Sequence, residues 1–290
     1  MSSLLVRCLP LLLCVFLAGC MSRGIPLADG VGEQPAARAL LLKSAEAHGL
    51  AAFRKVEDVS VAYAGEWYGL VSRIQPTLID ADFRQGSQER LLLGPEPLLG
   101  QIHHGPKGSK QVIRRPGQVQ VAYNGVPAGD GEVLAAAALV ADGYRMFLTS
   151  PFYFLEGNLS LQLGDAEAVE GRPCQTLVVV RRPGHGLSVE DRYQLFIDAE
   201  DYRLRRIRFT MEGLASTQGA IAEVDFFDHQ EIAGVLWPTR FYERLRKPIP
   251  GLPVHDWHLT GLDINRGLQA VDLEVGGFSP KAATPARPLD

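Results

Sequence analysis

Hydrophobic and polar residues alternate with a period of two through most of the second half of the chain. Short runs rich in Val, Ile, Phe and Tyr are separated by polar segments such as DAEDY and QEIAG, a pattern typical of strands joined as hairpins. The predicted strands of this half are CQTLVVVRR, DRYQLFID, RLRRIRFTME, AIAEVDFFDH, GVLWPTRFYERL and PVHDWHLTGLDI.

Two of these runs show the alternation most clearly, because every second residue is apolar. The residues that share the apolar side are Tyr193, Leu195 and Ile197 in the first run, and Ile207, Phe209 and Met211 in the second. Side chains alternate between the faces of a strand, so both runs can lay this side against one core. Arg206 and Arg208 then point the other way, and we interpret them as part of a solvated outer face in preference to an anion site.

The first half contains two segments with helical spacing. In PAARALLLKSAEAHGL, one helical face carries Ala37, Leu40, Leu41, Ser44 and Ala45, and Gly49 stands at the stop position. The segment DGEVLAAAALVADGYRMFLT begins with Asp130 as a predicted N-cap and is Ala-rich. Its apolar character nearly all round indicates a helix that is covered by the rest of the protein.

Further β-like runs lie between and around these helices: VEDVSVAY, TLIDADF, QERLLLG, QVIRR and QVQVAYNG. Roughly ten antiparallel strands, two substantial helices and no βαβ alternation predict an α+β fold. A sheet of this width curls. We therefore expect a large curved antiparallel β-sheet, a half-barrel, with helices packed on its concave side.

The amino terminus carries a secretion pattern. One cation, Arg7, precedes an apolar run from Cys8 to Phe16, and small residues then lead to Cys20. The run is shorter than the roughly 20 apolar residues of a spanning helix. LAGC resembles the lipobox of bacterial lipoproteins, which implies cleavage before Cys20 and triacylation of that residue with palmitate-type chains. The alternative is an ordinary secreted protein with a chance cysteine near its cleavage site.

This pattern gives the expected layout of the chain. Residues 1–19 form the lipoprotein signal peptide, 20–34 a lipidated tether, 35–278 a single domain and 279–290 a flexible tail. Met21 in the second mature position implies, by the same resemblance, an anchor in the outer membrane with the folded part facing the periplasm.

Composition excludes several kinds of function. The net charge of −4 becomes −5 without Arg7, and no dense basic block is present, so nucleic acid is not an expected partner. Once Cys8 and Cys14 leave with the signal and Cys20 is acylated, Cys174 remains alone. No disulfide can then form within the mature chain, and the apolar run beside Cys174 indicates buried packing.

Catalytic and metal-binding motifs are not found. The residues His255 and His258 are three apart on a predicted strand, so they face opposite sides and cannot easily share a metal. Asp225 and Asp228 are also three residues apart on a predicted strand, so they face opposite sides and do not form a paired-carboxylate site. GPKGSK is interpreted as a hairpin turn, since phosphate cradles usually open a helix. We expect no cofactor, no metal, no catalytic residue and no enzymatic activity.

Three consecutive stretches carry a resemblance to a known family. They are LGDAEAVEGRPCQTLVV, DRYQLFIDAEDYRLRRIRF and VDFFDHQEIAGVLWPTRF, with the Gly171 turn, the Asp198 to Arg203 hairpin and the entry from Gly234 to Pro238. AEAHGLAAFRKVEDV near the amino end is also similar. This layout resembles the periplasmic lipoprotein-localisation superfamily around LolA and LolB, including the outer-membrane lipoprotein-sorting-like proteins.

The resemblance implies an incomplete barrel, lidded by helices, that shelters acyl chains or another apolar ligand. We therefore expect an envelope lipoprotein that binds or transfers a hydrophobic ligand, or a lipoprotein, without converting it. The alternatives are a filled core made of the same side chains and a regulatory or interaction protein that docks a partner through its sheet. The residues expected to line the site, from their strand positions, are Tyr193, Leu195, Ile207, Phe209, Phe227, Trp237 and Phe241.

Overall fold

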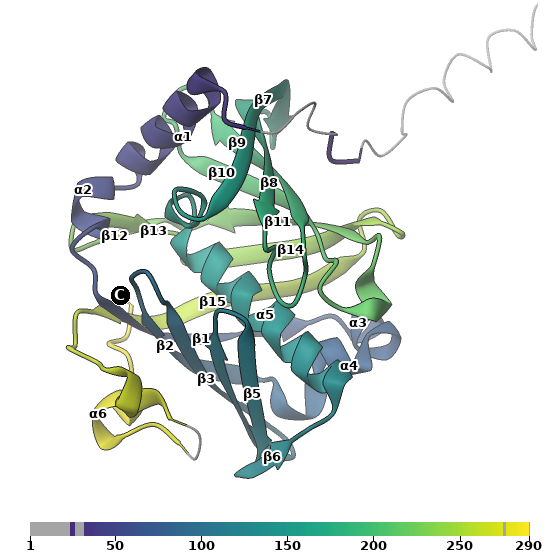
Figure 1. Cartoon of the computed structure of the whole chain (residues 1–290), viewed down its shortest axis with the longest axis vertical. Coiled ribbons are helices and arrows are strands. Elements are labelled where there is room, and N and C mark those ends of the chain that lie inside the picture. The colour runs from purple at the N-terminus through teal and green to yellow at the C-terminus, as the bar shows by residue number, and fades with distance from the viewer. Residues whose placement is uncertain (1–23, 27–31, 275–276, 290) are drawn as a thin grey trace, which may run out of the picture.

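The computed structural model describes residues 24–26, 32–274 and 277–289 (Figure 1). The α-helices are α1 (Pro35–Ala47), α2 (Leu50–Phe53), α3 (Gly69–Ile74), α4 (Pro76–Ile79), α5 (Gly131–Thr149) and α6 (Pro280–Ala283). The strands are β1 (Asp58–Trp67), β2 (Gly86–Leu92), β3 (Leu98–Gly105), β4 (Gly108–Arg115), β5 (Gln118–Tyr123), β6 (Val126–Ala128), β7 (Asn158–Val169), β8 (Arg172–Arg182), β9 (Asp191–Asp198), β10 (Leu204–Thr210), β11 (Ile221–Phe227), β12 (Gln230–Ile232), β13 (Val235–Trp237), β14 (Arg240–Lys247) and β15 (Pro253–Ile264). The 3₁₀ turns are η1 (Ala81–Phe83), η2 (Phe152–Phe154), η3 (Ala215–Thr217) and η4 (Ala270–Leu273).

A 13-stranded antiparallel sheet forms the body of the protein, in the order β6-β5-β4-β3-β2-β1-β15-β14-β11-β10-β9-β8-β7. The first and last strands pair at its centre, with Val59 opposite Ile264 and Trp67 opposite His255. The two halves of the chain therefore extend to opposite sides of this central pair. The sheet is strongly curved and does not close, which leaves β6 and β7 at its edges (Figure 1).

Helix α1 agrees with the sequence prediction. The buried residues of α1 are the predicted face, Ala37, Leu40, Leu41, Ser44 and Ala45. Gly49 follows this helix with φ +88°, and a Cβ atom there would lie 2.1 Å from the carbonyl oxygen of Gly234. Both the backbone conformation and this close approach require glycine at the end of α1.

The long helix α5 lies on the concave side of the sheet, as predicted (Figure 1). Its N-cap is Asp130, whose Oδ1 accepts hydrogen bonds from the backbone N–H groups of Glu132 (2.9 Å) and Val133 (3.0 Å). Most of its residues are buried, including Ala137 and Phe147. The predicted fold class, a curved antiparallel half-barrel with helices on its concave side, is confirmed.

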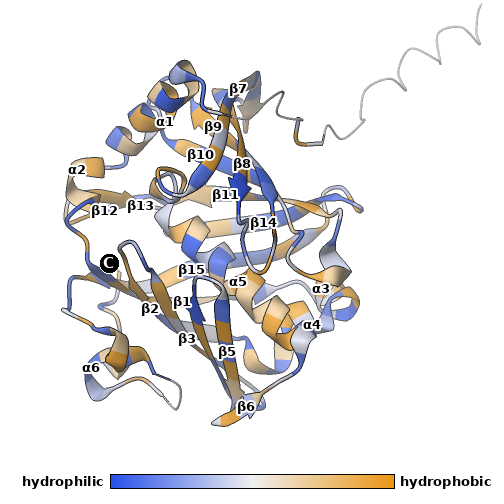
Figure 2. Ribbon diagram, in the orientation of Figure 1, coloured by the Kyte–Doolittle hydropathy of each residue, from blue (hydrophilic) through white to orange (hydrophobic). Residues whose placement is uncertain are grey.

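The core lies between α5, α1 and the concave face of the sheet. Hydrophobic residues alternate with hydrophilic ones along the strands (Figure 2). The predicted apolar sides of β9 and β10 belong to this core, which confirms the period of two. The largest fully buried aromatic side chains are Trp237, Trp257, Tyr193, Phe154, Phe196 and Phe241.

The segment TLIDADF is not a strand, contrary to the prediction. It forms α4 and η1, because Pro76 starts a short helix at a position that suits its fixed φ, and Asp80 turns the chain with φ +52°. Its apolar residues Leu78 and Ile79 are buried by the helix instead of by an alternating strand.

The prediction that Arg206 and Arg208 form a solvated face is also wrong. They do point away from the core, but Arg208 is only 1% exposed and its Nε donates to Glu223 Oε2 at 3.1 Å. Arg206 is paired with Asp225 on the neighbouring strand. Cross-strand ion pairs on the curved outer face bury these side chains.

The carboxyl end differs from the flexible tail that was expected. Ser279 caps α6, and Ala282 in that helix is fully buried. Arg90 of β2 donates its Nε to the carbonyl oxygen of Ala282 (2.6 Å) and its Nη2 to that of Thr284 (2.9 Å). Residues 279–289 therefore pack against the sheet.

In the expected tether, Ile25 packs with Val178 and Ile221. Cys20 and the rest of residues 1–23 lie outside the described residues. Cys174 is a free, buried thiol beside Val169 and Phe196, as predicted, and burial raises its pKa.

Candidate functional site

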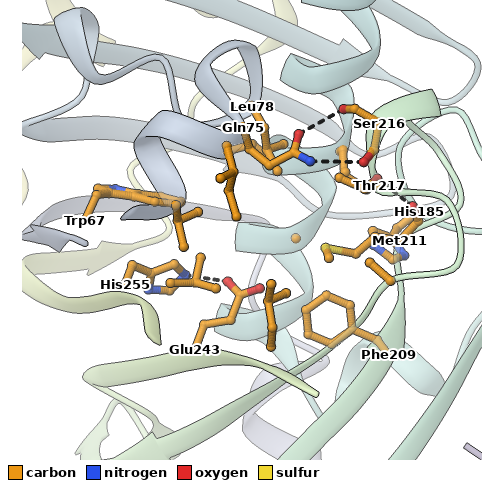
Figure 3. A pocket seen from close by; sticks show the side chains of 18 of the residues that line it. Trp67, Gln75, Leu78, His185, Phe209, Met211, Ser216, Thr217, Glu243 and His255 are labelled. Carbon is orange, nitrogen blue, oxygen red and sulfur yellow. Dashed lines mark hydrogen bonds and ion pairs between the residues drawn. The ribbon is translucent and has the colours of Figure 1, made fainter. Parts of the chain in front are cut away.

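A cavity of about 250 Å³ lies on the concave side, under α3 and α4 and beside α5 (Figure 3). Its walls come from the central strands β14 and β15, from β10, and from the loop between β10 and β11. The lining residues are Trp67, Val71, Ile74, Gln75, Leu78, Leu139, Val140, Gly143, Tyr144, Phe147, His185, Phe209, Met211, Ser216, Thr217, Gln218, Gly219, Ala220, Glu243, Leu245, Pro248, Val254 and His255.

Most of this wall is apolar. Phe209 and Met211 face it from the end of β10, and Leu245 from β14. On the helix side, Gly143 of α5 leaves space, because a Cβ atom added there would meet nothing within 4 Å. A glycine in the middle of a helix is unfavourable by about 1 kcal/mol relative to alanine. The cavity therefore exists partly because one helical position carries no side chain.

A buried contact between a histidine and a glutamate forms one polar spot in the wall. Nε2 of His255 lies 2.7 Å from Oε2 of Glu243, and both side chains are almost fully buried. The ring of His255 is also 4.7 Å from that of Trp67 and 6.3 Å from that of Tyr144, centroid to centroid. Nδ1 of His255 is buried and has no hydrogen-bond partner among the described residues, so this spot combines an aromatic surface with one polar contact and one unpaired nitrogen.

The hydroxyls of Ser216 and Thr217 are engaged in structural hydrogen bonds, whereas the buried Tyr144 hydroxyl has no hydrogen-bond partner among the described residues. Thr217 donates its hydroxyl to the carbonyl oxygen of Met211 at 2.7 Å. Nδ1 of His185 lies 3.0 Å from the hydroxyl oxygen of Tyr193, so this ring nitrogen has its partner in β9. Within the described residues, no group of three or more His, Cys, Asp or Glu side chains is placed to hold a metal ion.

A pair of reciprocal hydrogen bonds closes the cavity at the surface (Figure 3). Gln75, between α3 and α4, donates its Nε2 to the carbonyl oxygen of Ser216 at 3.0 Å, and the Ser216 hydroxyl donates to Gln75 Oε1 at 2.9 Å. Beside this contact, Ile74 lines the cavity and is 46% exposed. We refer to the Gln75–Ser216 contact as the latch, because it joins the two segments that cover the cavity.

Among the residues expected to line the site, Phe209 lies in the cavity wall. The core holds Tyr193, Leu195, Ile207, Trp237 and Phe241. The ring centroid of Phe241 lies 6.0 Å from that of Phe147 in the cavity wall, and the ring centroid of Trp237 lies 6.0 Å from that of Phe53 in α2.

Phe227 has a different environment from the other expected residues. Its ring is half-buried under the guanidinium of Arg240, 5.6 Å from the ring centroid, while its neighbour Phe226 enters the core.

Sequence reasoning did not identify the part of the wall that comes from the first half of the chain. Trp67, Leu78 and Tyr144 reach the cavity from β1, α4 and α5, segments that meet only in the folded protein. One local signal was present, because Gly143 interrupts an otherwise strongly apolar helix. An isolated glycine within a helical pattern often has a packing reason.

Comparison with known proteins identifies the fold family that the architecture resembles. No family model and no curated protein matches the sequence. Solved structures do match. A LolA superfamily protein from Nitrosomonas europaea aligns over 82% of this chain and 97% of its own, with 13% identity and a TM-score of 0.50. This chain has a LolA-like fold. A DUF1329 family protein from Desulfovibrio piger aligns over 82% and 96% of the two chains, with 12% identity and a TM-score of 0.50.

The resemblance seen in the sequence is thus confirmed at the level of the fold. At 12–13% identity the likeness extends to the architecture and not to individual site residues. Within this LolA-like fold, the cavity occupies the concave side between the sheet and its helices. Among the described residues, no helix combines the length and apolar character needed to cross a membrane.

Proposed function

We propose that this protein binds a hydrophobic ligand, such as an acyl chain, in the cavity beside α5 and does not convert it chemically. The apolar cavity on the concave side of the sheet carries this proposal. Apolar surface removed from water contributes about 25 cal/mol per Å². A preformed and mostly apolar cavity therefore favours an alkyl group over a polar ligand that the wall does not hydrogen-bond.

The size of the cavity sets how much of a ligand it holds. Its volume of about 250 Å³ is below the roughly 300–1,000 Å³ that is common for sites of drug-sized ligands. At about 0.8 kcal/mol per buried methylene, a segment of about five methylenes gains about 4 kcal/mol. A longer chain requires the cover over the cavity to move, and the latch holds that cover by side-chain hydrogen bonds at the surface.

The proposal also includes the location of the protein in the cell envelope. Acylation of Cys20 would anchor the protein in the outer membrane with its domain in the periplasm, where lipids and lipoproteins are the available hydrophobic cargo. Stable anchoring needs more than one acyl chain, which a triacylated cysteine provides. Cys20→Ala is expected to abolish labelling by an alkyne fatty acid and to release the protein from membranes. Labelling and membrane retention that survive this substitution would contradict the anchor.

Native mass spectrometry with lipid extraction tests the ligand directly. The protein is purified without detergent from a bacterial envelope, as a version that begins at Gly24 behind an ordinary secretion signal. A lipid that co-purifies in stoichiometric amount, or uptake of an added fatty acid, is the expected result. A ligand-free mass together with no uptake of any added lipid would refute the proposal.

A further inference from the structure

A second, polar cavity of about 910 Å³ lies on the other side of α5. The helix separates the two, because Gly143, Tyr144 and Phe147 line the apolar cavity while Asp142 and Arg145 line this one. We call it the basin. Its walls also include the turn at Gly94–Pro97, the turn at Arg115–Gly117, Tyr153, Glu156, the end of β8 at Arg181 and the loop at Pro183–Ser188.

Positive charge dominates the basin, which is lined by the arginines Arg114, Arg115, Arg145 and Arg181 against the acids Asp142 and Glu156. One of these cations is neutralised. Arg114 forms a bidentate contact with Asp142, with Nη2–Oδ2 at 2.7 Å, and donates to the carbonyl oxygen of Gly186 at 2.7 Å. The remaining arginines therefore decide the electrostatics of the basin.

Arg181 is held in place without being neutralised. Its Nη1 donates to the carbonyl oxygens of Tyr153 (3.0 Å) and Glu156 (3.2 Å). Neutral carbonyl groups fix its position, but in the described part of the chain no carboxylate lies within ion-pair distance of it. A guanidinium has five N–H donors in a planar fork, so donors remain for another acceptor.

Arg145 has even fewer partners. Among the described residues, no hydrogen bond or ion pair engages its guanidinium. The guanidinium carbon lies 5.5 Å from the centroid of the Tyr153 ring. Arg181 lies 4.3 Å from the centroid of the same ring. Burial lowers the pKa of Arg145; Tyr153 and Asp142 act against this shift, and the charge of Arg181 adds to it. Two partly desolvated cations thus share one aromatic ring.

We propose that the basin is a binding site for a phosphate-bearing group, which Arg145 and Arg181 hold beside the ring of Tyr153. An anion between two like charges removes their repulsion and supplies the acceptor that Arg145 lacks. Planar guanidinium forks match phosphate oxygens in bidentate geometry, with charge-assisted hydrogen bonds. Glu156 also lines the basin but is exposed to solvent. Apolar residues of the wall, such as Leu99 and Leu187, suit the glycerol and proximal acyl part of a phospholipid.

Isothermal titration of the folded protein tests the site with three probes at physiological ionic strength. These are inorganic phosphate, dihexanoyl phosphatidic acid below its micellar concentration, and dihexanoylglycerol, which has the same acyl chains without phosphate. Wild type is expected to bind at least one phosphate compound and to bind dihexanoylglycerol at least tenfold more weakly. Binding of phosphatidic acid alone identifies a lipid headgroup as the source, and equal binding of both phosphate compounds identifies free phosphate.

The matched variants are Arg145→Gln and Arg182→Gln. Arg182 is the next residue after Arg181, but it is already paired with Glu190 at 2.5 Å. Arg145→Gln is expected to weaken phosphate binding at least tenfold, and Arg182→Gln to leave it within twofold of wild type. No binding of either phosphate compound by wild type, equal binding of dihexanoylglycerol, or equal losses in both variants would overturn the proposal.

Thermal melts provide a second readout that a purely structural role would not change. The phosphate compound should raise the melting temperature of wild type and not that of Arg145→Gln. Without it, Arg145→Gln should melt no lower than wild type, because the substitution removes one of two neighbouring like charges. Should the glutamine variant fold poorly, Arg145→Lys keeps the charge without the planar fork and is expected to bind more weakly. Equal stabilisation of wild type and Arg145→Gln by the phosphate compound would refute the site.

Discussion

Filling the apolar cavity from the helix side should raise stability and abolish ligand binding at the same time. Gly143 is buried within α5 and lines the cavity, and a Cβ atom there meets nothing within 4 Å. Gly143→Leu therefore places an alkyl side chain in empty space without an initial clash. Most substitutions of buried residues destabilise a protein. An increase in stability here would follow from the cavity and not from a general property of the position.

The magnitude has two contributions. Replacing glycine by leucine inside a helix gains about 0.8 kcal/mol in intrinsic propensity. Burying the leucine side chain gains about 1.5–3 kcal/mol, and fixing its rotamers costs about 0.5–1 kcal/mol. The net expectation is about 2 kcal/mol, which corresponds to a rise in melting temperature of roughly 4–8 °C for a domain of this size.

Calorimetric melts and uptake of a fluorescent fatty acid would be measured on three variants. Gly143→Leu should melt higher and take up no probe. Gly143→Ala should gain about 1 kcal/mol from propensity alone and keep most of its uptake. Gly131→Leu is the matched control, because Gly131 is an exposed residue at the start of the same helix with nothing within 4 Å of its added Cβ. A stabilised Gly143→Leu with normal uptake would show that the ligand binds elsewhere, and a destabilised one would show that the space is not available.

Other predictions concern the latch and the pH dependence of stability. In the latch, Gln75→Ala and Ser216→Ala should each accelerate ligand uptake, and a double-mutant cycle on uptake should give a coupling of about 1 kcal/mol; zero coupling would exclude the latch as the gate. Burial lowers the pKa of His48 from 6.5 to about 4, and its Nε2 accepts from the N–H of Leu204 while its Nδ1 faces the carbonyl oxygen of Leu236. The neutral form is therefore the native one, so its contribution is complete above pH 6.5 and about 3 kcal/mol is lost as the pH falls towards 4. Denaturant titrations at several pH values should show this loss in wild type and a smaller one in His48→Gln; equal losses would contradict the assignment.

The two long helices, α1 and α5, and most strands were predictable because each follows from local chemistry. The buried face of α1 and the N-cap at Asp130 depend only on spacing and on one side chain. The adjacent residues Phe226 and Phe227 show what local chemistry cannot predict, which is the side chain that faces the core. Two adjacent apolar residues fit either face of a strand, and the choice depends on register. In the fold, Phe226 stands opposite Phe241 in the core and Phe227 stands opposite Arg240 outside it.

The outer face of the sheet was misjudged for a related reason. An arginine at every second position of a strand is typical of a solvated face, and nothing in one strand reveals its neighbour. In the sheet, Arg206 stands opposite Asp225 and Arg208 opposite Glu223. Opposite charges at directly facing positions stabilise a strand pair. The burial of these arginines is therefore a consequence of pairing between β10 and β11, which requires the register of both strands.

Helix α5 shows which features of the two cavities can be predicted from the sequence and which depend on the fold. The helix is apolar nearly all round because it is enclosed, so its pattern does not reveal which side meets which part of the sheet. Its interior nevertheless carries Asp142 and Arg145, which are three residues apart and therefore share a face. Charged side chains inside an enclosed helix need polar surroundings, so this pair marks the side of α5 that meets the basin. Gly143 and Phe147, four residues apart, mark the side that meets the apolar cavity. One helix thus separates a mostly apolar cavity from a cationic one, and this division would allow the protein to bind an alkyl group and a phosphate group independently.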